Sequence, residues 1–149
     1  GSPKKPEAVV KEAMKNDKPT DYKVTANTTS VSLNDDKNFT EPRVYDRSNF
    51  GLHAKASGNI LIISARNKSD LEIGISPQDL AIITGADKRN DLIRISPGTA
   101  DLSQFSGVVL KGNDRAVIRL PLKVSVPVKG ARLVYNNPRQ TIQFYVDIE

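Results

Sequence analysis

Basic side chains gather in one stretch of the chain. Residues 108–140 contain seven Lys or Arg residues and one Asp, a balance of +6 in a chain of net charge +5. Arg115, Arg119 and Lys123 recur at every fourth position, which on an extended strand places them on one face at spacings of about 13 Å. Such a face attracts lipid headgroups, a wall polymer or an acidic protein. The candidate anionic-partner face comprises Arg115, Arg119, Lys123, Lys111 and Arg132.

The same basic residues have a structural explanation. Charges and prolines on an outer strand protect a sheet against edge-to-edge aggregation. Pro121 and Pro127 alternate with the apolar positions of this stretch, on the same parity as the basic residues. A binding face and a protected edge therefore both remain open.

Groups that could perform catalysis are scarce. An active site needs titratable groups that converge in a pocket, and the chain has one histidine, His53, and no cysteine. No nucleophile elbow, zinc-protease motif or phosphate loop is present. We expect no enzyme, no catalytic residue, no cofactor and no small-molecule substrate.

Acidic loops are the only candidates for a metal site. Asp35 and Asp36, and residues 87–91, offer the oxygen ligands that calcium prefers. Neither loop has the ligand spacing of a known calcium motif, and Lys88 and Arg89 interrupt the second. We interpret both as solvated turns and expect no metal.

Composition favours one domain built of sheets. The 149 residues suffice for a single core, and 38% hydrophobic residues with no tryptophan require a core of Ile, Leu and Val. The pI of about 9.5 is typical of nucleic-acid binding, but the aromatic platform that stacks bases is missing from the basic stretch, which argues against that partner.

The N-terminal residues differ in texture from the rest. Gly1 and Ser2 are typical of a cloning remnant, and we predict a linker or a short helix at residues 7–15 within segment 1–20. The β-sandwich domain is expected at residues 21–149. No apolar run is long enough to cross a bilayer, although a signal or lipid anchor could precede residue 3.

Residues 59–76 combine an apolar run with an alternating one. The four apolar residues at 60–63 predict a mid-sheet strand covered on both faces, so Ile62→Ala is expected to be among the most destabilising changes. Residues 67–70 predict a turn, and Leu71, Ile73 and Ile75 then alternate with polar residues. We predict a hairpin formed by these two strands.

The longest alternation runs from Ala116 to Val128, with every second residue apolar. It predicts one strand, or two strands joined by a kink at Pro121, and the prolines indicate a sheet edge there. Residues 111–114 predict a hairpin loop to the strand before it. Eight to ten short strands in total predict an all-β fold, an antiparallel two-sheet immunoglobulin-like β-sandwich, with a closed barrel as the alternative.

The pattern resembles a known group of domains. Residues 60–67 with Ser69-Asp70, Leu110-Lys-Gly-Asn, the long alternating strand, Leu133-Val-Tyr and Phe144-Tyr-Val-Asp-Ile are similar to the telokin-like, immunoglobulin-fold accessory domains of bacterial exported proteins and lipoproteins. This resemblance covers residues 22–149 and supplies no catalytic or ligand residues. It implies an extracytoplasmic location, in the periplasm or at the cell surface, with anchoring or secretion through a preceding segment.

We therefore expect a non-catalytic binding or assembly module of a bacterial cell-envelope protein, whose partner is another envelope protein or an anionic surface. The alternative is a carbohydrate-binding or enzyme-accessory β-sandwich. Sugar platforms use exposed aromatic rings, for which the candidates are Tyr22, Tyr45, Phe50, Tyr135 and Tyr145.

Overall fold

The computed structural model describes residues 19–23, 26–43, 49–84, 91–97, 108–123 and 128–149. This part of the chain is all-β, as the sequence predicts, and its only helices are two short 3-10 turns. In order the elements are β1 (Thr20–Lys23), β2 (Ala26–Ser32), η1 (Leu33–Asp35), β3 (Phe50–Ser57), β4 (Ile60–Asn67), β5 (Ile73–Ile75), η2 (Pro77–Asp79), β6 (Leu80–Thr84), β7 (Asp91–Pro97), β8 (Val108–Leu110), β9 (Arg115–Pro121), β10 (Arg132–Asn137) and β11 (Ile142–Asp147). The helix predicted at residues 7–15 lies outside the described residues.

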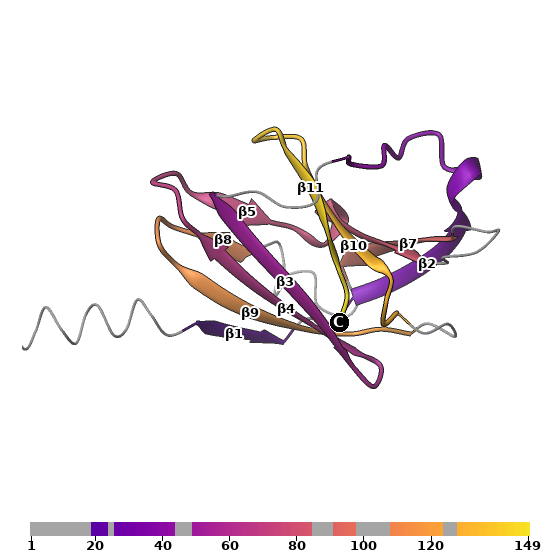
Figure 1. Cartoon of the computed structure of the whole chain (residues 1–149), viewed down its shortest axis with the longest axis horizontal. Coiled ribbons are helices and arrows are strands. Elements are labelled where there is room, and N and C mark those ends of the chain that lie inside the picture. Colours follow the sequence, from indigo (N-terminus) through magenta and orange to yellow (C-terminus); the bar gives the residue numbers. More distant parts are fainter. Residues whose placement is uncertain (1–18, 24–25, 44–48, 85–90, 98–107, 124–127) are drawn as a thin grey trace, which may run out of the picture.

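The strands form three sheets (Figure 1). Sheet A has the order β1-β9-β4-β3, sheet B the order β11-β10-β6-β7-β2, and β5 pairs with β8 in a small sheet C. All these pairings are antiparallel except β1 with β9, which is parallel. The prediction of a purely antiparallel fold is therefore wrong at this one edge.

One hydrophobic core lies between sheets A and B, because alternate residues of each strand point to the same face. Its members from sheet A are Leu52, Ala54, Leu61, Ile63, Ala65, Ala116, Ile118 and Leu120, and from sheet B Leu80, Ile82, Ile93, Ile95, Leu133, Tyr135, Phe144 and Val146. Three rings meet at its centre, with centroids 5.4 Å apart for Phe50 and Tyr135 and 5.7 Å apart for Tyr135 and Phe144. With no tryptophan available, these rings and the aliphatic residues fill the core.

The strand covered on both faces is β6, and not residues 60–63 as predicted. All five residues of β6 are buried, whereas Ile60 is 36% exposed and Ile62 is only half-buried. The prediction for β4 is right that this strand lies in the middle of its sheet. It is wrong about coverage, because nothing in the described residues packs over the outer face of sheet A as a second layer.

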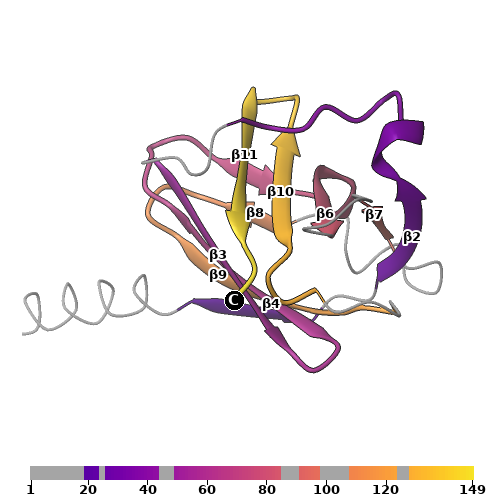
Figure 2. The same ribbon diagram turned by 45° about the vertical axis from the view of Figure 1, so that its right-hand side comes forward.

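Residues 33–43 form the extra layer over sheet B. We call this segment the strap, and Figure 2 shows it passing from the end of β2 across to β11. Phe39 packs on a second cluster that includes Ala81 and Val134, and the Thr40 carbonyl accepts a hydrogen bond of 3.2 Å from Gln143 Nε2. This cover explains why β6 is dry on both faces.

Two predicted hairpins are wrong in their pairing. The strand at Ile73–Ile75 does not pair with β4 but with β8, and the turn at residues 111–114 connects β8 of sheet C to β9 of sheet A. The turns themselves are present: Asp114 N donates to the Lys111 carbonyl at 3.0 Å, and Asn113 has a φ of 68°. Tight turns are local, whereas the choice of strand partner is not.

The long alternating strand ends at Pro121, where a proline removes a ladder donor. Leu122 continues inward and is buried, and residues 124–127 lie outside the described residues. β9 is not an edge strand, because β1 and β4 flank it. The short strand β1 pairs only with residues 116–119, so the end at Pro121 has no partner on that side among the described residues.

Candidate functional site

The outer face of sheet A brings basic residues from four strands together. Strand register sets its rows, because paired residues on adjacent strands point to the same side. The first row is Gly51, Arg66 and Arg115; the second is His53, Ser64, Val117 and Asp21; the third is Lys55, Ile62, Arg119 and Lys23. We call this surface, together with Lys68, the basic face.

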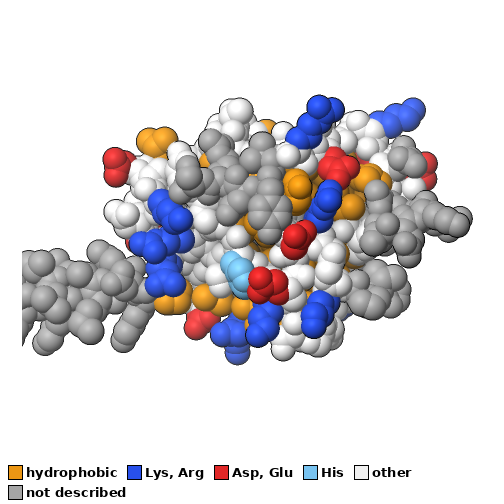
Figure 3. All heavy atoms as spheres, in the orientation of Figure 1, with side chains coloured by type: hydrophobic (Ala, Val, Ile, Leu, Met, Phe, Trp, Pro, Cys, Tyr) orange, Lys and Arg blue, Asp and Glu red, His pale blue; other side chains and the backbone are white. Residues whose placement is uncertain are grey.

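Charge on the basic face is strongly unbalanced. Its rows and Lys68 supply six Lys or Arg residues, and the acidic residue among them is Asp21. Asp21 lies 3.5 Å from Arg119, but both side chains are well exposed, so this pair contributes little to stability. Figure 3 shows a group of Lys and Arg side chains toward the left of the face it presents, and an acidic side chain directly against the single histidine, in agreement with the 2.9 Å pair of His53 and Glu149.

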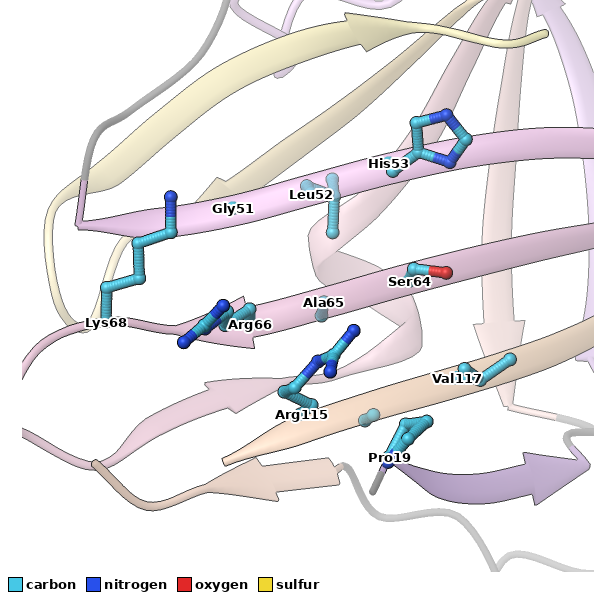
Figure 4. A pocket seen from close by; sticks show the side chains of 11 residues that line it. Pro19, Gly51, Leu52, His53, Ser64, Ala65, Arg66, Lys68, Arg115 and Val117 are labelled. Carbon is cyan, nitrogen blue, oxygen red and sulfur yellow. The ribbon is translucent and has the colours of Figure 1, made fainter. Parts of the chain in front are cut away.

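A groove of about 310 Å³ crosses the face at the first and second rows. Its floor includes Gly51, Ser64 and Val117, and its basic lining is Arg66, Lys68 and Arg115, with His53 farther along β3 (Figure 4). Arg66 and Arg115 are directly paired across β4 and β9. The groove is therefore lined by three cationic side chains together with small and apolar residues.

Gly51 shapes one end of the groove. A Cβ atom placed there would lie 3.8 Å from Cε of Lys68, so the missing side chain leaves the space over which Lys68 lies. Figure 4 shows that the Lys68 side chain reaches toward Gly51. The same view shows Arg66 and Arg115 on neighbouring strands. A bare glycine in a strand commonly marks a close approach of another group.

Asn67 fixes the loops behind this end of the face. It is fully buried, and its Nδ2 donates to the Leu110 carbonyl at 2.9 Å while its Oδ1 accepts from Ser69 N at 2.9 Å. Its backbone also bonds Asn113 and Asp114 at 2.8 and 3.0 Å. One asparagine thus ties the turn after β4 to the turn before β9, which holds Lys68 and Arg115 in place.

The residues predicted from sequence are only partly brought together. Arg115 and Arg119 lie on the basic face, and Lys123 is exposed two residues beyond β9. Lys111 is exposed in the turn beyond the end of the face, with its N–H donating to Asp114 Oδ2 at 3.1 Å. Arg132 lies on the outer face of sheet B, on the opposite side of the molecule from the basic face.

Arg132 has a local role there. Its Nη1 is 3.2 Å from Glu41 Oε1 of the strap, and its guanidinium stacks 4.6 Å from the centroid of Tyr145. Arg94 holds the strap in the same way, 2.8 Å from Asp36 and over the ring of Phe39. The Arg94 hydrogen bond lowers the pKa of Asp36 below its ordinary value of 3.8.

Sequence reasoning missed Lys23, Lys55, Arg66 and Lys68. Alternation at Ser64, Arg66 and Lys68 in the sequence shows that they share an outward face. No local signal places that face beside Arg115, because the contact joins residues about fifty positions apart.

His53 and the acidic candidates for a metal site are placed as follows. His53 Nε2 lies 2.9 Å from Glu149 Oε2, and both side chains are more than half exposed. Within the described ranges no three His, Cys, Asp or Glu residues gather as they would around a metal ion, and no helix there could span a membrane. Of the calcium candidates, Asp36 binds Arg94, and residues 87–90 lie outside the described residues.

Comparison with known proteins finds no matching family model, no similar curated protein and no similar solved structure.

Proposed function

We propose that this protein is a non-catalytic, immunoglobulin-like binding or assembly module of a bacterial cell-envelope protein, and that its basic face docks on an anionic surface. The observation that carries the docking proposal is the convergence of basic side chains from β1, β3, β4 and β9 on one outer sheet face. Because these residues come from distant parts of the sequence, their proximity is a product of the fold.

The arrangement places like charges side by side. Arg66 and Arg115 are directly opposite each other, and like charges in that position destabilise a sheet. Exposed basic residues in three rows of one sheet face can attract an anionic partner over a long range. Their summed charges raise the local concentration of that partner.

The sandwich fold and the envelope location of this proposal have separate support. Two mainly antiparallel sheets around one core are compatible with an immunoglobulin-like sandwich. The envelope setting follows from the resemblance in sequence pattern, which implies an extracytoplasmic accessory domain.

The carbohydrate-binding alternative lacks its aromatic platform among the described residues. Phe50 and Tyr135 are buried in the core, Tyr22 packs partly against it, and Tyr145 lies under Arg132. Tyr45 lies outside the described residues. A row of exposed rings suited to stacking on sugars is therefore not formed by the four described candidates.

Co-sedimentation with anionic vesicles, and pull-down on an immobilised anionic polymer, test the docking proposal. We expect wild-type binding at low salt that weakens at physiological salt, where the screening length is about 8 Å. The double variant Arg66→Glu/Arg115→Glu should lose it. The matched control Lys37→Glu/Arg43→Glu changes the charge equally on exposed residues of the strap and should retain most of it.

Two results contradict the proposal. One is absence of wild-type binding to either probe at low salt. The other is an equal loss in the two double variants, because that would make net charge, and not the basic face, responsible.

A further inference from the structure

The groove in the basic face combines a recess with a closely spaced pair of arginines. Arg66 and Arg115 bring two guanidinium groups from directly paired positions, and Lys68 adds one ammonium group beside Gly51, which has no side chain. The third row presents Lys55, Arg119 and Lys23 around the half-buried Ile62, and none of these four residues lines the groove.

The lining residues match the chemistry of a phosphate group. A guanidinium presents planar, paired N–H donors that bind phosphate or carboxylate oxygens in a bidentate manner, and a lysine adds a compact point charge. Paired residues of antiparallel strands have Cα atoms about 4.5–5.5 Å apart, so Arg66 and Arg115 can grip one tetrahedral anion from two sides. Ser64 supplies a hydroxyl in the adjacent row.

We propose that this groove is a discrete site for a phosphate group carried on a linear polymer, with Arg66, Arg115 and Lys68 as its ligands. The inference rests on the proposed function, since it names the ligand of the same face. Cations of the third row, about 13 Å farther along the strands, bind further phosphates of the same chain.

A chain fits this surface better than the two other phosphate-bearing partners. A groove that crosses three strands admits an extended polymer, whereas a flat bilayer surface meets the raised side chains around it and leaves the floor uncovered. Nucleic acid is disfavoured because single strands bind by stacking successive bases on aromatic rings, and the three rows contain one ring, that of His53.

The first experiment maps inorganic phosphate by NMR titration at constant ionic strength. We expect shifts of the Gly51, Ser64 and Val117 amides, and a loss of affinity of roughly tenfold or more in Arg66→Gln and in Arg115→Gln, because each removes a charge-assisted hydrogen-bond donor. Arg119→Gln is the matched control for a single phosphate in the groove: it removes the same charge from the same face, but in the third row, which one free phosphate bound in the groove does not reach. The phosphate affinity read from the groove amides should therefore change less than threefold in this variant.

A second variant tests shape without changing charge. Gly51→Val puts a strand-favouring side chain into the groove, where a Cβ meets Lys68 only at ordinary contact distance. We expect unchanged thermal stability within a few degrees and phosphate affinity reduced as in the arginine variants.

The third experiment compares sources of the phosphate: poly(glycerol phosphate), phosphatidylglycerol vesicles and an oligothymidylate of equal phosphate concentration. The polymer should bind at least tenfold more tightly than free phosphate, because linked groups bind with a high effective concentration. Gly51→Val should weaken the polymer and leave residual vesicle binding unchanged.

The outcomes separate this inference from the proposed function. Equal losses in the three arginine variants with no effect of Gly51→Val overturn the discrete site and leave docking by the basic face intact. Tighter binding of vesicles or of oligothymidylate than of the polymer overturns the choice of ligand. If the wild-type protein binds none of the probes at low salt, both proposals are overturned.

Discussion

Ile62 and Ile63 are adjacent on β4 and point to opposite faces of sheet A. Ile63 is fully buried in the main core, and Ile62 is half-buried on the basic face beside Lys55 and Arg119. Replacement by Ala removes the same atoms and the same strand preference at both positions, so the difference in the free energy of unfolding isolates burial. The structure also changes the sequence-based expectation that Ile62→Ala is among the most destabilising changes, because Ile63 and not Ile62 is fully buried.

The magnitudes follow from the atoms removed. Ile63→Ala deletes three buried carbons, worth about 2.4 kcal/mol at roughly 0.8 kcal/mol each, and the residual cavity brings the total to about 3–5 kcal/mol. At Ile62 about half of the transfer cost applies and solvent fills the space, which gives roughly 1 kcal/mol. Urea unfolding measures both, provided that the slopes agree with that of the wild type. Equal losses, or a larger loss for Ile62→Ala, would refute the assignment of faces on β4.

Three further changes probe other elements of the fold. Asn67→Ala should cost about 2–4 kcal/mol in chemical unfolding, because it leaves several loop hydrogen-bonding groups without partners; exposed Asn59→Ala, with a cost near zero, is its control. Burial raises the pKa of Tyr135 from 10.0 to about 12, so between these pH values the folded state keeps a proton that the unfolded state releases. The free energy of unfolding should therefore fall by about 3 kcal/mol between pH 10 and 12. Tyr135→Phe should abolish that contribution. The lowered pKa of Asp36 stabilises the strap above pH 3.8, and this contribution should be lost as the pH falls through the folded value; amide exchange at Phe39 reports the release, and Asp36→Asn should show fast exchange at neutral pH.

Strand positions were largely predictable because alternation is a local signal. In β3, β9, β10 and β11 the residues of one parity are mainly apolar, and inward residues such as Phe144 and Val146 are buried. His53 has the outward parity of β3, and its side chain is 57% exposed. Period-two patterns survive in the structure wherever one face is wet.

Coverage and pairing were not predictable in the same way. The runs at 60–63 and 80–84 are both mainly apolar in sequence. They differ in the structure because the strap covers the outer face of β6, whereas Ile62 on the outer face of β4 is only half-buried. Two strands joined by a tight turn usually pair with each other. After the turn at Asn67, however, β5 pairs with β8 in sheet C and not with β4. Its buried amide is satisfied by Leu71 and Leu110 carbonyls, so the loop is stable without a hairpin.

The sheet topology also bears on the two explanations for the basic residues, a protected sheet edge and a binding face. Protection is needed where a strand has an unpaired side, and the edge strands of sheet A are β1 and β3, which carry Lys23 and Lys55. Arg66 lies on β4, inside the sheet, and Arg115 lies at the start of β9, just before the residues that pair with β1. Direct pairing of these two arginines places like charges side by side, which is unfavourable for the sheet. The sequence-based argument for a protected edge therefore applies best to Lys23 and Lys55, whereas the proposed anionic ligand would offset the repulsion between the two arginines.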